Sequence, residues 1–182
     1  TRRGRPVVVP QGLTARTAAE QGRGHVLQLA KQRRRALVFT TAQQANVKGS
    51  AQNLARLIRR HWPQARVLMI DATTHEAAEQ LAADPNGVAA AHDFVIITPA
   101  ITSGLSIDAP GLFDEVVAIA AGGRLTCEHI AQAAARVRDP RCPVTIYAPA
   151  SAPQLRIGSG ATTPAELLRH LAPYQRQWVV SQ

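Results

Sequence analysis

Several kinds of residue are scarce in this chain of 182 residues, and each scarcity excludes a class of protein. Aromatic residues make up only 4% of the sequence, too few for a domain that stacks bases on aromatic platforms. Two cysteines, Cys127 and Cys142, do not make a disulfide scaffold. No apolar run approaches the roughly 20 residues of a membrane-spanning helix, and no signal peptide with a long apolar core follows Thr1.

Acidic residues are also few, with 12 Asp and Glu against 21 Lys and Arg, which gives a net charge of +9. An excess of positive charge of this size predicts a polyanionic partner, most simply nucleic acid or a nucleotide phosphate. The hydrophobic content of 46% is that of a globular protein. Intrinsic disorder is therefore excluded as a class.

Short apolar runs alternate with helical patterns along most of the chain. The apolar runs predict strands at 7–9, 36–40, 66–70, 93–98, 115–120 and 143–148, and the helical patterns predict helices at 25–31, 50–61, 75–83 and 126–138, with a turn at 84–87. Continuously apolar strands that alternate with helices predict an α/β fold of three layers, with a mainly parallel sheet covered by helices on both faces. We expect residues 1–150 to form this domain, and residues 151–182 to form a linker, a helix and a tail.

The loop after the 93–98 strand carries groups suited to phosphate. It contains hydroxyls at Thr98, Thr102 and Ser106, with Gly104 and Asp108 among them. Parallel sheets place ligands at the carboxyl ends of their strands, and hydroxyls and free backbone N–H groups there can bind phosphate oxygens. A long polar connection would have the same composition, so both interpretations stay open on these residues alone.

The 126–138 helix supplies basic side chains near the same edge. Gln132 and Arg136 are four residues apart and are expected to share a helix face, and Arg138 lies close to the end of the helix. An arginine at this edge could brace a γ-phosphate. A solvated basic face is the alternative interpretation.

Taken together, these stretches resemble the second RecA-like domain of superfamily 2 helicases. The stretch ALVFTT at 36–41 resembles motif IV, ITPAITSGLSID at 97–108 resembles motif V, and QAAARVRD at 132–139 resembles motif VI. Within that superfamily, TTAQ at 40–43, LMID at 68–71 and FDEVVAIA at 113–120 are most similar to bacterial plasmid replication proteins of the primase-helicase or origin-binding type.

The resemblance implies a cytoplasmic, ATP-dependent DNA helicase that uses Mg²⁺ and grips single-stranded DNA by its backbone. Arg136, Arg138 and Gln132 would face the triphosphate as catalytic residues, and Gly104, Ser106 and Asp108 would lie near the nucleotide. The implied nucleic-acid contacts are Thr40, Thr41, Gln43, Asn46, Lys48, Thr98 and Thr102. No metal site is expected on the chain itself, because the spacing of its cysteines and histidines fits no zinc pattern.

Part of the helicase machinery is absent from this sequence. No G-x-x-x-x-G-K-[ST] loop occurs, and Asp71 is followed by Ala72 where a catalytic glutamate would be expected. We therefore expect ATP to be held mainly by a preceding RecA-like domain of the same polypeptide, and this chain alone to be inactive as an ATPase.

Two departures from motif VI leave further questions open. Ala135 replaces its glycine, and Arg138 follows Arg136 by two residues rather than three, so either arginine could act as the finger. The alternative function is a degenerate helicase-like domain that binds DNA or protein without catalysis.

Overall fold

The computed structural model describes residues 5–42, 47–99, 105–120 and 127–150, with residues 127–129 described as backbone only. The chain divides into two compact units, residues 1–150 and 151–182, and the second lies outside the described residues. The first unit contains strands β1 Val7–Val8, β2 Ala36–Thr40, β3 Val67–Ile70, β4 Phe94–Ile97, β5 Glu115–Ile119 and β6 Val144–Tyr147. Its helices are α1 Ala15–Lys31, α2 Ala51–His61, α3 His75–Ala83, α4 Pro85–Ala91 and α5 Cys127–Ala134.

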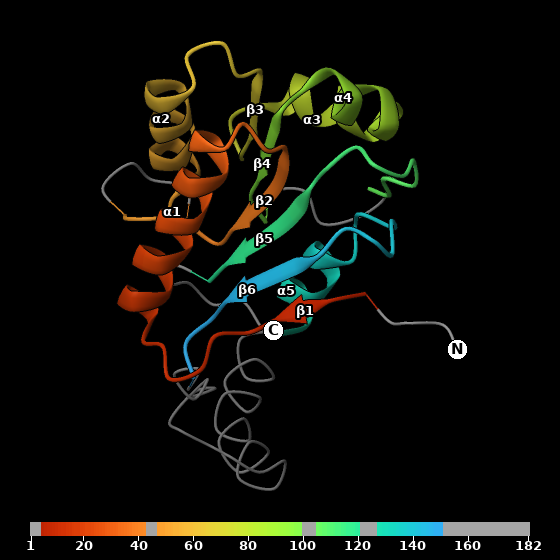
Figure 1. Cartoon of the computed structure of the whole chain (residues 1–182). Helices are drawn as coiled ribbons and strands as arrows, with labels where there is room; N and C mark the ends of the chain where they lie inside the picture. The colour runs from red at the N-terminus through yellow and green to blue at the C-terminus, as the bar shows by residue number, and fades with distance from the viewer. Residues whose placement is uncertain (1–4, 43–46, 100–104, 121–126, 151–182) are drawn as a thin grey trace, which may run out of the picture. The chain divides into compact units, whose positions relative to one another are not determined.

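All six strands pair in parallel within one sheet, in the order β1-β6-β5-β2-β4-β3 (Figure 1). The central strand is β2, in which Ala36 pairs with Phe94 of β4 on one side and with Glu115 of β5 on the other. Every residue of β2, β4 and β5 is buried, as the continuous apolar runs in the sequence predict.

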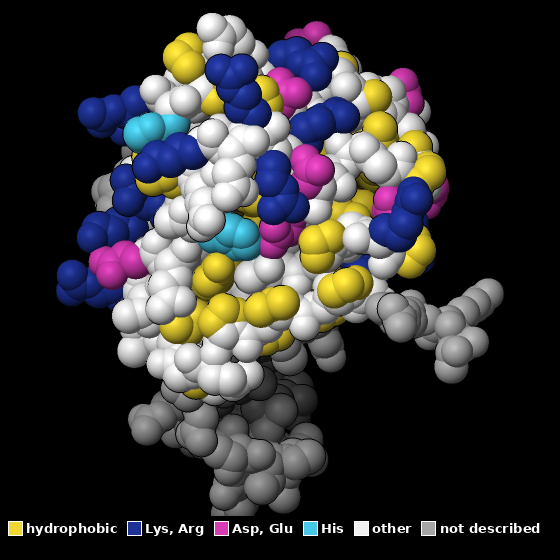
Figure 2. Space-filling model, viewed as in Figure 1, with side chains coloured by type: hydrophobic (Ala, Val, Ile, Leu, Met, Phe, Trp, Pro, Cys, Tyr) yellow, Lys and Arg dark blue, Asp and Glu magenta, His cyan; other side chains and the backbone are white. Residues whose placement is uncertain are grey.

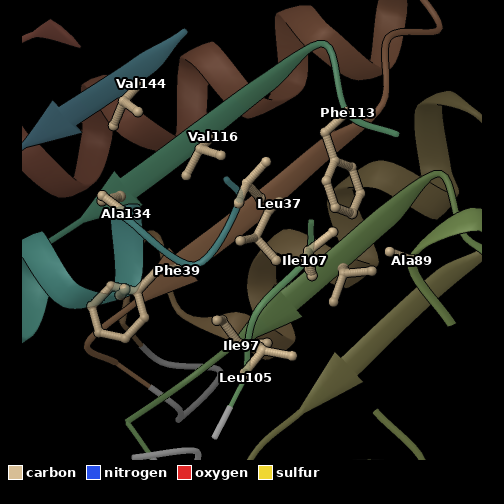
Figure 3. Close-up of a cluster of buried hydrophobic side chains, with 14 of the residues drawn as sticks. Leu37, Phe39, Ala89, Ile97, Leu105, Ile107, Phe113, Val116, Ala134 and Val144 are labelled. Carbon is tan, nitrogen blue, oxygen red and sulfur yellow. The ribbon is translucent and has the colours of Figure 1, made fainter. Parts of the chain in front are cut away.

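Helices cover both faces of the sheet, which confirms the predicted three-layer α/β fold. Helices α1 and α2 lie on one face of the sheet, and α3, α4 and α5 lie on the opposite face (Figure 1). The buried side chains of each set form a cluster with the face that they cover. Leu105 and Ile107, which follow β4 in the chain, also point into the second cluster, beside Ile97 and Leu37 (Figure 3). The segment after β4 is therefore part of the core on that face.

Polar side chains cap the N-termini of α1 and α2, the two helices on one face of the sheet. Ser50 caps α2 by accepting a hydrogen bond from the Asn53 N–H at 3.2 Å, and the predicted helix 50–61 is confirmed. Helix α1 begins ten residues earlier than its apolar pattern indicates, at a capping box formed by Thr14 and Thr17. Its early turns are buried through Ala18, Ala19 and Gly22, and residues this small give little hydrophobic signal.

The predicted turn at 84–87 is wrong, because these residues begin α4. Asp84 accepts a hydrogen bond from the Gly87 N–H at 2.9 Å, and Pro85 occupies the first helical position. A capping aspartate followed by proline is a helix start as well as a turn signal, and here the burial of Ala89 favours the helix.

The predicted helix over 126–138 is too long at its C-terminal end, because α5 ends at Ala134. Arg136 therefore lies in the following turn and Arg138 in an extended segment, so neither shares a helix face with Gln132. The Arg136 N–H donates to the Ala133 carbonyl at 3.3 Å, three residues back, which closes the last turn tightly.

No helix in the described part of the chain has the length and apolar character needed to cross a lipid bilayer.

Two glycines of α1 test its packing against the sheet. A Cβ at Gly22 would lie 2.7 Å from Ile119 Cγ1 of β5, whereas a Cβ at Gly24 would meet no atom within 4 Å. We predict that Gly22→Ala lowers the free energy of unfolding by about 1–3 kcal/mol, since the added methyl group would overlap the buried Ile119 side chain. Gly24→Ala should raise it by about 0.5–1 kcal/mol through helix propensity. Urea unfolding measures both, and shifts of the same sign would contradict this packing.

Candidate functional site

The segment after β4 and the segment after α5 meet through their backbones. Ile107 and Val137 form a parallel bridge, in which the Ile107 N–H donates to the Arg136 carbonyl at 2.8 Å and the Arg138 N–H donates to the Ile107 carbonyl at 2.9 Å. Both bridging side chains are buried in the core. Because neighbours in an extended chain point to opposite sides, the residues flanking the bridge are directed away from that core.

Those flanking residues form a polar cluster. The Ser106 hydroxyl donates to Asp108 Oδ1 at 2.8 Å and accepts from Arg138 Nε at 3.3 Å. Asp108 and Arg138 are exposed and Ser106 is half-buried. Two separate motifs predict these three residues at one site, and in the structure Ser106 contacts both Asp108 and Arg138.

Arg136 lies beside this cluster, half-buried, on the chain segment that pairs with Ile107. Burial lowers the pKa of its guanidinium, yet an arginine stays charged at neutral pH. A positive charge that is partly withdrawn from water interacts more strongly with an approaching anion than an exposed one does. Gln132 is exposed on α5.

Arg5, to which the sequence analysis gave no role, holds the turn after α5. Its guanidinium donates from Nη1 to the Ala134 carbonyl at 3.0 Å and to the Val137 carbonyl at 2.8 Å, and from Nε to the Cys142 carbonyl. The carbonyls of Ala134 and Val137 lie at the end of α5 and just beyond it, where they have no partner within the helix. Arg5 therefore fixes the backbone that carries Arg136 and Arg138, and an arginine in the basic stretch that opens the sequence gives no signal of such a contact.

Asp139 ties the other ends of the two segments together. One oxygen of its buried carboxylate accepts from the Gly111 N–H at 2.8 Å, and the other accepts from the Arg141 N–H at 2.9 Å. The backbone N–H groups of Arg141 and Gly111 lower the pKa of this carboxyl. Its place as the last residue of the motif VI resemblance was a signal that could have identified it.

Asn86, at the start of α4, supports the cluster from the side. Its Oδ1 accepts hydrogen bonds from the N–H groups of Asp108 and Ala109, both at 3.0 Å. The helix that the sequence analysis interpreted as a turn thus carries a residue that positions Asp108.

Two of the residues expected to contact nucleic acid, Thr40 and Thr98, are buried near the ends of their strands. Thr40 and Thr98 are 0% and 3% exposed, and the Thr40 hydroxyl donates to the Gly49 carbonyl at 2.7 Å. As placed, neither side chain is available to a ligand, which corrects the expectation of a direct contact by either one. Thr40 is the last residue of β2, and Thr98 directly follows β4.

Lys48 and Thr41 are the accessible members of that group. Lys48 is exposed and forms an ion pair with Glu20 of α1 at 2.8 Å, and the Lys48 hydrogen bond is the main cause that lowers the pKa of Glu20. Thr41 is half-buried. The remaining predicted site residues, Gln43, Asn46, Thr102 and Gly104, lie outside the described residues.

Within the described ranges, no group of three or more His, Cys, Asp or Glu side chains is arranged to hold a metal ion. What the cluster offers a ligand is two guanidinium groups, a hydroxyl and one carboxylate, on segments fixed by backbone pairing. Guanidinium and hydroxyl groups are donors suited to phosphate oxygens.

Comparison with known proteins gives one relative by sequence. No protein-family model matches the chain. An uncharacterized protein of Picosynechococcus sp. is 33% identical over 138 residues, which are 73% of this chain and 14% of that protein. The chain thus spans about a seventh of the length of the relative that it matches.

Two solved structures are similar in part. The C-terminal part of the Fun30 ATPase domain superimposes with a TM-score of 0.42 and 12% identity, over 70% of this chain and 40% of that one. A variant of Dbp5 from S. cerevisiae, bound to RNA and ADP BeF3, superimposes with a TM-score of 0.47 and 13% identity, over 94% of this chain and 38% of that one.

Asn86 tests whether α4 positions the polar cluster. We predict that Asn86→Ala speeds amide hydrogen exchange of Asp108 and Ala109 by about tenfold, because each lost hydrogen bond contributes about 0.5–1.5 kcal/mol. Asn86→Asp should keep most of the protection, since a carboxylate oxygen replaces the amide oxygen. NMR-detected exchange measures both variants. Unchanged protection in the alanine variant, or equal loss in both, would show that Asn86 does not hold this segment.

Asp139 predicts a pH dependence of stability. Because its pKa is lowered in the folded state, its ionised form stabilises the fold above the unfolded-state pKa of about 3.9, and that contribution is lost as the pH falls through the lower folded-state value. We predict that between pH 5 and pH 2 the free energy of unfolding falls less steeply for Asp139→Asn than for the wild type. Urea unfolding over this range measures the slopes, and parallel slopes would disprove the role of the carboxylate.

Proposed function

We propose that this chain is the second RecA-like domain of a superfamily 2 helicase, and that it forms one wall of an ATP site whose other wall is a further RecA-like domain. The pairing of Ile107 with Val137 carries this proposal. It joins the two segments that resemble motifs V and VI, which the helicase interpretation requires to face one nucleotide. The three-layer parallel fold is compatible with the same interpretation.

Within this proposal the chain's own residues bind and orient the triphosphate. ATP would supply the phosphoryl group, with its Mg²⁺ held mainly by the other domain. Arg136 and Arg138 would stabilise negative charge that develops on the γ-phosphate, and Ser106 would present a hydroxyl already oriented by Asp108 and Arg138. Gln132 and Gly104 complete the proposed nucleotide-facing set. The fixed backbone under these side chains supports such a role, because arginine-finger catalysis depends on positioning.

The proposed nucleic-acid grip lies on the loops that follow β2 and β4. Lys48 supports it most directly, since an exposed ammonium paired with one surface carboxylate can exchange that partner for a phosphate at little cost. Thr41, Gln43, Asn46 and Thr102 are proposed to contact the backbone of single-stranded DNA without reading bases. Thr40 and Thr98 would act by placing these loops. Opening and closing of the two domains would move the grip along the strand.

The finer assignment, to the replication of plasmids or mobile elements in the cytoplasm, rests on the sequence resemblance alone. A second candidate function is a helicase-like module that binds DNA or protein and has lost catalysis. Two observations favour it: Ala135 stands where motif VI has glycine, and Arg138 already donates to Ser106 within the chain.

ATP hydrolysis separates the two candidates. We predict no turnover by this chain alone, and DNA-stimulated turnover when it is joined to a RecA-like domain that carries a G-x-x-x-x-G-K-[ST] loop. In the joined protein, Arg136→Ala should lower kcat by about 10³-fold or more if it is the finger, and Arg138→Ala should do so if Arg138 is. Arg16→Ala, an exposed arginine of α1, is the matched control and should leave kcat unchanged.

A phosphate-release assay measures these rates. Robust turnover by the chain alone that is lost in Arg136→Ala would contradict the two-domain proposal. Turnover in the joined protein that survives both arginine substitutions, or no DNA-stimulated turnover at all, would favour the binding module.

A further inference from the structure

The outer face of α2 is basic along its length. Its exposed positions carry Gln52, Arg56, Arg59, Arg60 and His61, and the helix contains no acidic residue. Figure 2 shows Lys and Arg side chains gathered over the side of the molecule where α1 and α2 lie. The inner face of α2 packs through Leu54 and Ile58 into the cluster on that side of the sheet, so the arginines cannot turn inward.

Most other arginines with described contacts are engaged within the fold. Arg35 donates to three carbonyls at the end of α4, Arg66 pairs with Asp93 at 2.9 Å, and Arg141 pairs with Asp139 at 3.4 Å. Among the described residues, by contrast, no ion pair joins Arg56, Arg59 or Arg60 to a carboxylate. Three positive charges thus lie on one helix face with no carboxylate of the described residues to neutralise them, and the repulsion between them would be relieved by a bound anion.

A shallow groove runs between α2 and the edge strand β3. It has a volume of about 380 Å³ and is lined by Gln52, Ala55, Arg56, Arg59 and Met69. Its lining combines the apolar side chains of Ala55 and Met69 with the amide of Gln52 and the guanidinium groups of Arg56 and Arg59. Arg59 is held along the groove by a hydrogen bond from Nη2 to the Val67 carbonyl at 3.2 Å, on the edge of β3 that has no neighbouring strand. This contact leaves its remaining N–H groups to donate outward.

The chemistry of the groove favours a phosphodiester backbone over an acidic protein. Stable protein interfaces centre on buried aromatic or large aliphatic anchors, and the lining of the groove offers a single large apolar side chain, the half-buried Met69. Trp62, which ends α2, packs edge-on against Phe94 in the core, so it is not a platform for bases. Residues three and four apart on a helix have Cβ atoms about 5–6 Å from each other, so Arg56, Arg59 and Arg60 are neighbours on one face and can reach adjacent phosphates of one strand.

We propose that the groove formed by Gln52, Arg56 and Arg59, together with Arg60, binds the sugar-phosphate backbone of nucleic acid without sequence preference. It is separate from the proposed nucleotide site, because α2 lies on one face of the sheet and the pairing of Ile107 with Val137 lies on the other. The inference does not use the proposed nucleotide site, so it stands whether or not the chain takes part in ATP hydrolysis.

A binding measurement on the full 182-residue chain tests this proposal. Arg56→Gln combined with Arg60→Gln should weaken binding of a fluorescent 20-nucleotide single strand about tenfold at low salt. It should also reduce the slope of log K against log salt by about 1.4, since each lost phosphate contact on a single strand accounts for about 0.7. The loss should be equal for oligothymidine and for a mixed sequence.

Lys31→Gln is the matched control, because Lys31 is an exposed cation of α1 outside the groove. Binding of the strand should change little in this variant. The Tm of thermal unfolding should be the same for the wild type, the double variant and Lys31→Gln. The proposal would be overturned if the double variant bound the strand as tightly as the wild type does. It would also be overturned if Lys31→Gln lost as much affinity for each charge removed as the double variant loses. Polyglutamate of equal charge that displaces the strand as well as unlabelled DNA does would assign the groove to an acidic protein instead.

Arginine modification of the wild-type chain gives a second readout that needs no variant. Bound oligonucleotide should protect Arg56 and Arg60 from phenylglyoxal, as detected by mass spectrometry, while Arg16 stays reactive. Full reactivity of Arg56 and Arg60 in the complex would also overturn the proposal.

Discussion

The candidate site depends on one backbone interaction, the parallel bridge between Ile107 and Val137. Its two hydrogen bonds join chain segments that are thirty residues apart in sequence, and the burial of both side chains fixes the pair against the core. Every contact of the polar cluster follows from this constraint, because it sets which side chains face away from the core. Arg5 and Asn86 then hold the paired segments from elsewhere in the chain, and Asp139 joins the far ends of the two segments.

The three-layer architecture can be predicted almost completely from the sequence. Continuous apolar runs predict β2, β4 and β5 because these strands are buried on both faces, and alternation with helices predicts the parallel sheet. Helix α2 is also predicted to its ends, since Ser50 caps it and the charged and apolar positions separate clearly. Small buried residues such as Ala18 and Gly22 hide the first turns of α1, because their burial leaves no apolar period to detect.

The site could be predicted only in part, for physical reasons that differ by residue. Ser106, Asp108 and Arg138 were assigned by motif, and the structure brings them into contact. The end of α5 was misplaced because the pairing that draws Arg136 and Val137 out of the helix comes from a segment distant in sequence. Arg5 and Asn86 act through hydrogen bonds to backbone groups of other elements, and no local pattern marks such partners. For Thr40 and Thr98 the sequence predicts too much, because hydroxyls near strand ends suit a ligand. In the fold both side chains are buried, and the Thr40 hydroxyl is hydrogen-bonded to the Gly49 carbonyl.

The central claim is that residues 105–108 and 136–138 form one wall of a triphosphate pocket. Its most direct test is photolabelling of the chain, joined to a RecA-like domain with a phosphate-binding loop, by an ATP analogue that carries a photoreactive group on its γ-phosphate. The account predicts that mass spectrometry finds the label on both segments, and that unmodified ATP prevents the labelling. Label on neither segment, or on only one of them, would contradict it.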